Sequence, residues 1–188
     1  NKEAIKNADL IIIAVRPSSV RDVCLEISPF INRHNQIIIN FAAGISSEQL
    51  KDWFTYENYR LPYIFLAMPN TAMELNEGLT FISPVNVKPI HTALVKAIFD
   101  SVGKTLVVEE NMINAGMALA SSGLAYAMKY ILASVHGGTS MGFSREDAIR
   151  VVLQTVKGAS MLIHEHETDP EDEIAKIATP EGYTIKGL

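Results

Sequence analysis

The 188-residue sequence contains a single cysteine, Cys24, so an internal disulfide and a multi-cysteine zinc site are both excluded. This cysteine content predicts a reducing, cytoplasmic setting. No unbroken apolar run is longer than the six residues 10–15, whereas a bilayer span needs roughly 20. No charged segment followed by an apolar one opens the chain. We therefore predict no membrane helix and no secretion signal.

Positive charge is scarce as well. The chain has 16 Lys and Arg against 21 Asp and Glu, and six of those acids lie within residues 164–173. The rest of the chain is close to neutral and has no basic segment of the kind that binds nucleic acid, so we predict no nucleic-acid partner. The His-Glu-His-Glu run at 164–167 predicts a solvated helix end rather than a metal site, because residues two apart do not share a helix face.

The sequence also lacks G-x-G-x-x-G, the phosphate loop that follows the first strand of a dinucleotide-binding fold. The first residue is Asn1 rather than Met. We expect the sequence to begin inside a longer chain, after that first unit, although a unit that was never present would leave the same pattern.

What the first half does contain is an alternation of strands and helices. Short β-branched apolar runs predict strands at 10–15, 37–41, 63–67, 79–83 and 105–108. Amphipathic spacing predicts helices at 18–27, 46–54 and 89–102. Short connections in such an alternation imply a parallel, doubly wound sheet.

The second half predicts helices only. Residues 111–135 favour a long helix, which we expect to break at Gly137 and Gly138. Ser144 and Asp169 are typical N-caps of two further helices, the first running to residue 163. We therefore predict an α/β domain over 1–110 and an all-α domain over 111–188.

Three predicted strand ends carry residues suited to a ligand, because ligands of open parallel sheets bind beyond the carboxyl ends of the strands. Arg16 can meet a phosphate or ribose, Gly44 permits close backbone approach, and Asn70 offers both donors and an acceptor. Each alone is also explained by an ordinary turn. Together they predict one crevice, lined by Ala14, Val15, Arg16, Pro17, Ala42, Ala43, Gly44 and Asn70.

Two more candidate positions lie in the helical half. The hydroxyls of Ser121 and Ser122 in a long apolar helix indicate either a nearby ligand or close helix packing. The run Thr179, Pro180, Glu181, Gly182, Tyr183, Thr184 precedes an expected helix start. The free N–H groups of such a start favour a carboxylate, and a plain interhelical turn is the alternative reading.

In their order and spacing these motifs resemble the pyrroline-5-carboxylate reductase family. The similarity runs across nearly the whole chain. The matching segments are Ala14-Val15-Arg16-Pro17, Ala42-Ala43-Gly44, Met68-Pro69-Asn70-Thr71, Ser101-Val102-Gly103, Ser122-Gly123-Leu124-Ala125-Tyr126 and the segment from Thr179 to Ile185.

The resemblance implies a Rossmann-type domain that binds NADPH, with NADH possible, and a helical domain that forms a homodimer or larger homo-oligomer. It implies hydride transfer from the nicotinamide to the cyclic imine 1-pyrroline-5-carboxylate, which yields L-proline. The crevice residues would hold the cofactor. Ser122 and Thr184 would be catalytic, and Thr179, Gly182 and Tyr183 would join them in binding the substrate. The choice between NAD and NADP stays open, because the deciding residues lie upstream of Asn1.

The sequence departs from the family pattern near the implied site. Met117 replaces a Thr of many members, Ala120 and Leu124 alter the Ser-Gly-Pro segment, and Glu181 adds an acid beside the implied carboxylate site. Two alternatives therefore stay open. One is a related reductase of another small imino or keto acid, and the other is a non-catalytic, dimeric ligand-binding relative.

Overall fold

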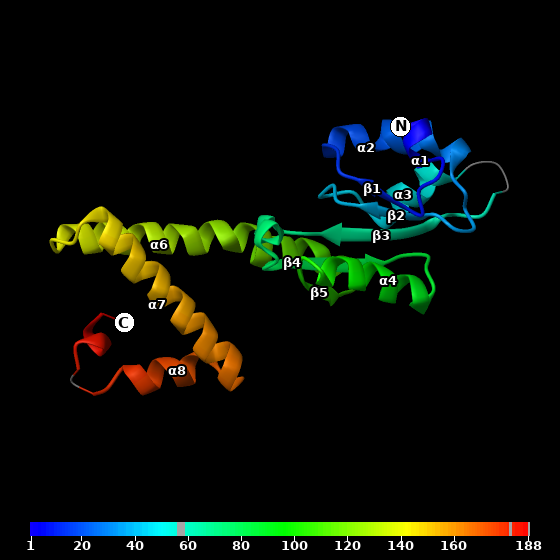
Figure 1. The fold of residues 1–188 in the computed structure, drawn as a ribbon. Helices are drawn as coiled ribbons and strands as arrows, with labels where there is room; N and C mark the ends of the chain where they lie inside the picture. The colour runs from blue at the N-terminus through cyan, green and yellow to red at the C-terminus, as the bar shows by residue number, and fades with distance from the viewer. Residues whose placement is uncertain (56–58, 181, 188) are drawn as a thin grey trace. The chain divides into compact units, whose positions relative to one another are not determined.

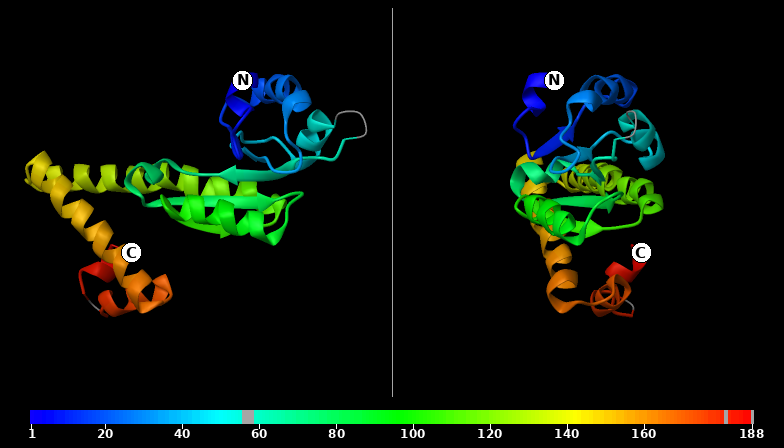
Figure 2. Two further views of the ribbon diagram at one scale, coloured as in Figure 1. Left: turned by 45° about the vertical axis from the view of Figure 1, so that its right-hand side comes forward. Right: turned by 90° about the vertical axis from the view of Figure 1, so that its right-hand side faces the viewer.

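The structure is a computed structural model that describes residues 1–55, 59–180 and 182–187. The chain divides into two compact units, Asn1–Leu124 and Ala125–Leu188. The first unit contains a sheet with helices packed against it, and the second is helical (Figures 1 and 2). The predicted domain boundary near residue 110 stays a prediction.

The sheet has five strands in the order β1-β2-β3-β4-β5. Strands β1 (Leu10–Ile13), β2 (Ile37–Asn40) and β3 (Tyr63–Met68) are parallel, as predicted. The prediction is wrong for β4 (Gly78–Pro84), which is antiparallel to β3, whereas β5 (Gly103–Val107) is parallel to β4. The β3–β4 connection holds only the 3-10 helix η2 (Thr71–Leu75), which is too short for a crossover, so the chain reverses.

Helices cover both faces of this sheet. Alternate strand residues point to opposite faces, so β2 and β3 contribute side chains to two separate cores. Ile38, Ile64 and Leu66 belong to the core on the face covered by α2 and α3. Ile39 and Phe65 belong to the opposite core, which α4 covers. Besides η2, the described helices of this unit before residue 110 are α1 (Lys2–Ile5), α2 (Pro17–Ile27), η1 (Ser28–Phe30), α3 (Ser47–Phe54) and α4 (Pro89–Asp100).

A long helical stretch follows β5, as predicted, but it is not uniform. It consists of α5 (Glu110–Gly116), a π-helical segment η3 (Met117–Ser121) and α6 (Ser122–Ser140). In η3 the backbone N–H of Ser122 donates to the carbonyl of Met117, five residues back instead of four. A Cβ on Gly116 would lie 2.8 Å from the Phe81 ring, so this glycine lets α5 lie directly on β4.

The helix break predicted at Gly137 and Gly138 is wrong, because α6 continues to Ser140. The next helix, α7 (Arg145–His166), packs close to α6 at this point: a Cβ on Gly138 would lie 3.1 Å from the Cβ of Ala148. The glycine therefore serves close helix packing. The chain turns only afterwards, at Gly142, where φ is +102°.

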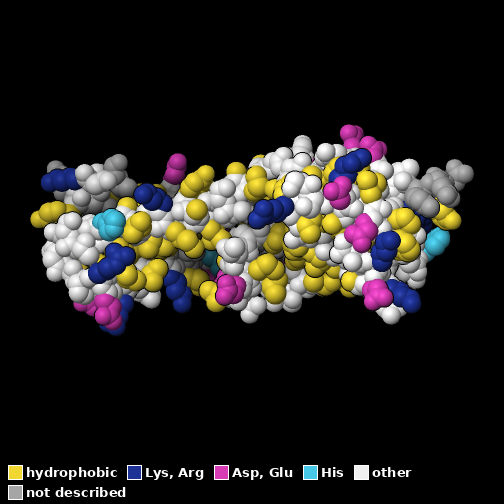
Figure 3. All heavy atoms as spheres, turned by 90° about the horizontal axis from the view of Figure 1, so that it is seen from above, with side chains coloured by type: hydrophobic (Ala, Val, Ile, Leu, Met, Phe, Trp, Pro, Cys, Tyr) yellow, Lys and Arg dark blue, Asp and Glu magenta, His cyan; other side chains and the backbone are white. Residues whose placement is uncertain are grey.

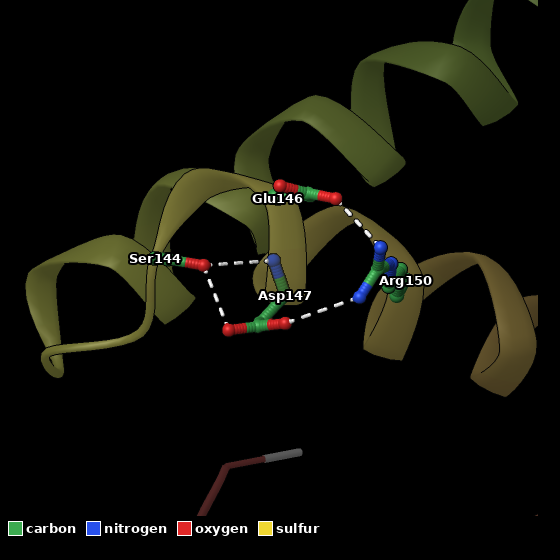
Figure 4. A network of polar contacts seen from close by, with 4 residues as sticks. All are labelled: Ser144, Glu146, Asp147 and Arg150. Atoms are coloured by element: carbon green, nitrogen blue, oxygen red, sulfur yellow. Dashed lines mark hydrogen bonds and ion pairs between the residues drawn. The ribbon is translucent and has the colours of Figure 1, made fainter.

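Side-chain caps begin both later helices, as predicted. The hydroxyl of Ser144 accepts from the backbone N–H of Asp147 at 3.0 Å, and Arg150 contacts Glu146 and Asp147 on the same turn of α7 (Figure 4). Asp169 caps α8 (Pro170–Ile177) by accepting from the N–H of Glu171 at 2.8 Å. A three-residue 3-10 helix, η4 (Thr184–Lys186), follows.

Buried Glu173 of α8 links α7 to α8 within the second unit. Its carboxylate accepts from the Thr168 hydroxyl at 2.7 Å and lies 2.5 Å from the Lys176 Nζ and 3.5 Å from the His166 Nδ1. These hydrogen bonds lower the pKa of Glu173 from 4.5 to about 2, and the one from Lys176 has the largest effect. The acid-rich stretch 164–173 therefore includes one buried carboxylate, that of Glu173, beyond the 164–167 run that we predict to be a solvated helix end.

Most large apolar side chains of the second unit remain exposed (Figure 3). They lie on all three helices and on the turn after them. Among the described residues of this unit only Val135, Ala148 and Glu173 are buried. The exposed set is Tyr126, Met128, Tyr130, Leu132, Met141, Phe143, Val151, Leu153, Met161, Leu162, Ile174, Ile177, Tyr183 and Ile185.

One stretch is long and apolar enough to cross a membrane by length and composition alone, namely the 31 residues Glu110–Ser140. Counting unbroken apolar runs misses it, because isolated Ser, Gly and Lys residues interrupt the run without making it polar. A helix that packs on a protein partner presents the same kind of surface. The absence of a membrane helix therefore stays a prediction.

Candidate functional site

The carboxyl ends of β1, β2 and β3 lie at one edge of the sheet. Ile13 pairs with Asn40, and Asn40 with Leu66, so β1 and β2 end at the same level and β3 continues two residues further, to Met68. The N–H of Phe41 continues the ladder by donating to the Ile13 carbonyl at 3.0 Å. The structure therefore brings the three predicted segments, at 14–17, 42–44 and 70, to the same edge.

A cavity of about 110 Å³ opens beyond β2 and β3. Buried Asn40 lines this cavity and fixes the backbone of Ala42 with two hydrogen bonds. The Asn40 side-chain amide accepts from the Ala42 N–H at 3.3 Å and donates to the Ala42 carbonyl at 3.1 Å. Gly44 has φ +76°, and no heavy atom lies within 4 Å of where its Cβ would be. The lining residues are Asn40, Ala42, Ala43, Gly44, Ile45, Ser46, Leu66, Ala67, Met68, Glu110, Ile113 and Asn114.

Glu110, at the start of α5, lines this cavity, and the sequence analysis missed it. Its Oε1 accepts from the backbone N–H of Ser47 at 2.8 Å, across 63 residues of sequence. Ser47 is the first residue of α3, so its N–H has no partner within the helix. A Glu that opens a helix directly after the last strand was the available signal, but no local rule pairs it with α3.

Arg16 lies at the junction of β1 and α2. It is exposed, it holds the N-cap position of the 11-residue α2, and Pro17 is the first helical residue, as expected of a proline there. The N-terminal N–H groups of α2 and the Arg16 guanidinium therefore lie together at the sheet edge. Both favour an anionic group, and Ala14 and Val15 beside them are exposed.

Asn70 is half-buried, and both ends of its side-chain amide are engaged. Its Oδ1 accepts from the Leu79 N–H at 3.2 Å, and its Nδ2 donates to the Ala120 carbonyl at 3.5 Å. The amide thus joins the end of β3 to β4 and to η3. Within the described residues one of its two N–H donors has no partner and can serve another acceptor.

Ser121 and Ser122 are both half-buried at the junction of η3 and α6, in the first unit. The Ser121 hydroxyl donates to the Pro69 carbonyl at 3.4 Å. No residue in the described part of the chain forms a hydrogen bond with the Ser122 side chain. The departures Met117 and Ala120 pack against the core of the first unit.

The predicted carboxylate site belongs to the second unit. Gly182 folds back on Thr179, since a Cβ there would lie 2.7 Å from the Thr179 hydroxyl, and Tyr183 is 95% exposed. Where the sequence predicts a helix start, the structure has the 3-10 helix η4, which begins at Thr184. Glu181 lies outside the described residues.

Two titratable side chains with shifted pKa values, Cys24 and His91, lie away from the cavity lining. Burial raises the pKa of the Cys24 thiol to about 12, which makes it a poor nucleophile. His91 packs on the Tyr63 ring with 3.9 Å between ring centroids, and burial, followed by Lys88 and Arg60, lowers its pKa.

Similarities to known proteins agree with this fold. The family model for pyrroline-5-carboxylate reductase dimerisation matches residues 110–188. A pyrroline-5-carboxylate reductase of Synechocystis is 33% identical over 189 residues, which cover all of this chain and 68% of that protein. Pyrroline-5-carboxylate reductase 1 of Dictyostelium discoideum is 34% identical, and the chain spans only 35% of its length.

The chain is also similar to solved structures of pyrroline carboxylate reductases. The Plasmodium falciparum pyrroline carboxylate reductase with NADP bound has a TM-score of 0.90 and 26% identity over all of this chain and 70% of that one. The 1-pyrroline-5-carboxylate reductase of Streptococcus pyogenes has a TM-score of 0.86, with 29% identity.

The sheet unit is thus a Rossmann-type α/β domain, with its cavity beyond the carboxyl ends of parallel strands, and a helical dimerisation region follows it. The chain belongs to the pyrroline-5-carboxylate reductase family.

Proposed function

We propose that the protein reduces 1-pyrroline-5-carboxylate to L-proline with NADPH, or with NADH, as the hydride donor. The observation that carries the proposal is the cavity beyond the ends of β2 and β3, in a chain whose relatives carry this activity in their names. The cavity of about 110 Å³ is smaller than the roughly 300 Å³ or more of a whole ligand pocket, so it suits one part of a dinucleotide.

The residues at this edge fit such a cofactor. Arg16 and the N-terminus of α2 favour a phosphate, and Ala42–Gly44 lets a planar group approach the backbone. Asn70 has one N–H left for a ligand acceptor. When bound, the nicotinamide supplies the hydride. The proposed cofactor residues remain Ala14, Val15, Arg16, Pro17, Ala42, Ala43, Gly44 and Asn70.

The substrate side requires less chemistry from the protein. An imine that binds already protonated needs no strong general acid, so holding the two reactants in attack geometry supplies most of the acceleration. In the proposal the Ser122 hydroxyl contacts the ring. Thr179, Gly182, Tyr183 and Thr184 hold the carboxylate through backbone N–H and hydroxyl groups.

Steady-state oxidation of NADPH and of NADH by the full-length protein, with and without 1-pyrroline-5-carboxylate, tests the proposal. We expect proline to form at an ordinary turnover of about 1–1000 per second. Turnover only with other cyclic imines or keto acids would assign the chain to the related reductase. Cofactor binding without any turnover would assign it to a non-catalytic relative.

We also propose that the protein forms a homodimer or larger homo-oligomer through residues 110–188. The support is the match of residues 110–188 to the dimerisation family model, together with the many large apolar side chains that the second unit leaves exposed. Light scattering on the purified protein tests it, and a monomer at micromolar concentration contradicts it. The cytoplasmic location remains a prediction from the single cysteine.

A further inference from the structure

The π-helical segment η3 is tied to the loop after β3 by two side-chain hydrogen bonds. Asn70 Nδ2 donates to the Ala120 carbonyl at 3.5 Å, and Ser121 Oγ donates to the Pro69 carbonyl at 3.4 Å. The other end of the Asn70 amide is fixed by the N–H of Leu79 on β4, at 3.2 Å. One amide group therefore connects the end of β3, the start of β4 and η3.

The π-helical turn sets the direction in which the side chains at the start of α6 point. An extra residue in one turn rotates the helix face that follows it by about 100°. Ser122, the first residue of α6, is the proposed substrate contact, and its direction depends on η3 keeping its π-helical form. π-helical turns within α-helices frequently occur at functional sites.

We infer that Asn70 is a positioning residue, which holds η3 in its π-helical form and thereby places Ser122 over the crevice. The inference rests on the proposed reductase function. It assigns to the Asn70 amide an effect on turnover that is separate from any contact with the cofactor.

The test compares two substitutions that make the same chemical change at different places. Asn70→Asp keeps an oxygen acceptor for the Leu79 N–H but removes the donor to Ala120. Asn86→Asp is the matched control, because the Asn86 Nδ2 also donates to main-chain carbonyls, those of Leu61 and Pro62, at 3.3 and 3.2 Å. Asn86 is half-buried like Asn70, and it lies outside the cavity lining.

We expect Asn70→Asp to lower kcat by about 10- to 100-fold, as a misplaced reacting group would cause. KM for NADPH should rise as well, because the proposed cofactor contact of Asn70 is lost. Hydrogen exchange of the backbone amides at 117–122 should become faster in the same variant. Asn86→Asp should change none of these three. A rise in KM for NADPH with unchanged kcat and exchange would mean that Asn70 contacts the cofactor without positioning η3, and would overturn the inference.

Ser121→Ala removes the other hydrogen bond between η3 and the loop after β3, the one from the Ser121 hydroxyl to the Pro69 carbonyl. It tests the inference if Asn70→Asp does not fold. Because both bonds hold one segment, their effects on kcat should be non-additive in the double variant. If the unmodified protein does not reduce 1-pyrroline-5-carboxylate, the proposed function fails, but hydrogen exchange still tests whether Asn70 holds η3. Equal exchange at 117–122 in Asn70→Asp and Asn86→Asp would then refute this role of Asn70.

Discussion

The contact between Glu110 and the first residue of α3 predicts a defined loss of stability. The Glu110 carboxylate satisfies the N–H of Ser47, which is 6% exposed and has no partner within the helix. Glu110→Ala leaves this buried donor without an acceptor. We expect the free energy of unfolding of the first unit to fall by about 1–3 kcal/mol.

A second variant separates the acceptor from its charge. Glu110→Gln keeps an oxygen that accepts from Ser47 but removes the negative charge near the positive end of α3. We expect it to cost only about 0.3–1 kcal/mol. The loss should therefore be clearly smaller than for Glu110→Ala.

Urea unfolding followed by tryptophan fluorescence measures the free energy of unfolding of the first unit. Trp53 is the single tryptophan of the chain and lies within α3, the helix that Glu110 caps. Exposed Glu109→Ala is the control, and we expect it to change the stability by less than about 0.5 kcal/mol. Equal midpoints for Glu110→Ala and Glu109→Ala would refute the capping role.

Three further predictions concern other parts of the chain. Because hydrogen bonding, from Lys176 above all, lowers the pKa of Glu173 from 4.5 to about 2, its stabilising contribution is present above pH 4.5 and is lost as the pH falls to about 2. Circular dichroism at decreasing pH should show Glu173→Gln to be less acid-sensitive than the unmodified chain. Gly116→Ala forces a methyl group into an aromatic ring of β4 and should destabilise the first unit by about 1–3 kcal/mol in the tryptophan assay. Leu153→Glu places a charge on the proposed oligomer surface and should lower the mass seen by light scattering, whereas Gln154→Glu, the same charge on a neighbouring polar residue, should not.

Local rules predicted the elements whose cause is local. The apolar runs marked β1, β2 and β3 to within two residues, because a strand buried on both faces, as β2 and β3 are, needs continuous apolar sequence. In β1 the same kind of run leaves Ile12 46% exposed. Ser144 and Asp169 were predicted as caps from residue type alone, since a cap bond spans only two or three residues.

Features that depend on tertiary contacts were not predicted. The glycines at 137 and 138 suggested a break, but close packing of Ala148 on Gly138 keeps the helix continuous. The reversal of β4 depends on the length of one connection, which the pattern of apolar residues does not encode. The capping of α3 by Glu110 joins residues 63 positions apart, beyond the reach of any periodicity.

The predicted crevice illustrates the same division. That three strand ends share an edge followed from the alternation of strands and helices, and the structure brings segments 14–17, 42–44 and 70 to that edge. What Asn70 does there could not be read from the sequence, because its hydrogen-bond partners come from β4 and η3. The ligand roles of these residues remain proposals.

The most direct test of the central claim is to follow the hydride itself. The full-length protein is supplied with NADPH that carries deuterium at the transferable position of the nicotinamide, together with 1-pyrroline-5-carboxylate. We expect L-proline with one deuterium on the former imine carbon, as seen by mass spectrometry and NMR. Unlabelled proline, or oxidised cofactor without proline, would contradict it.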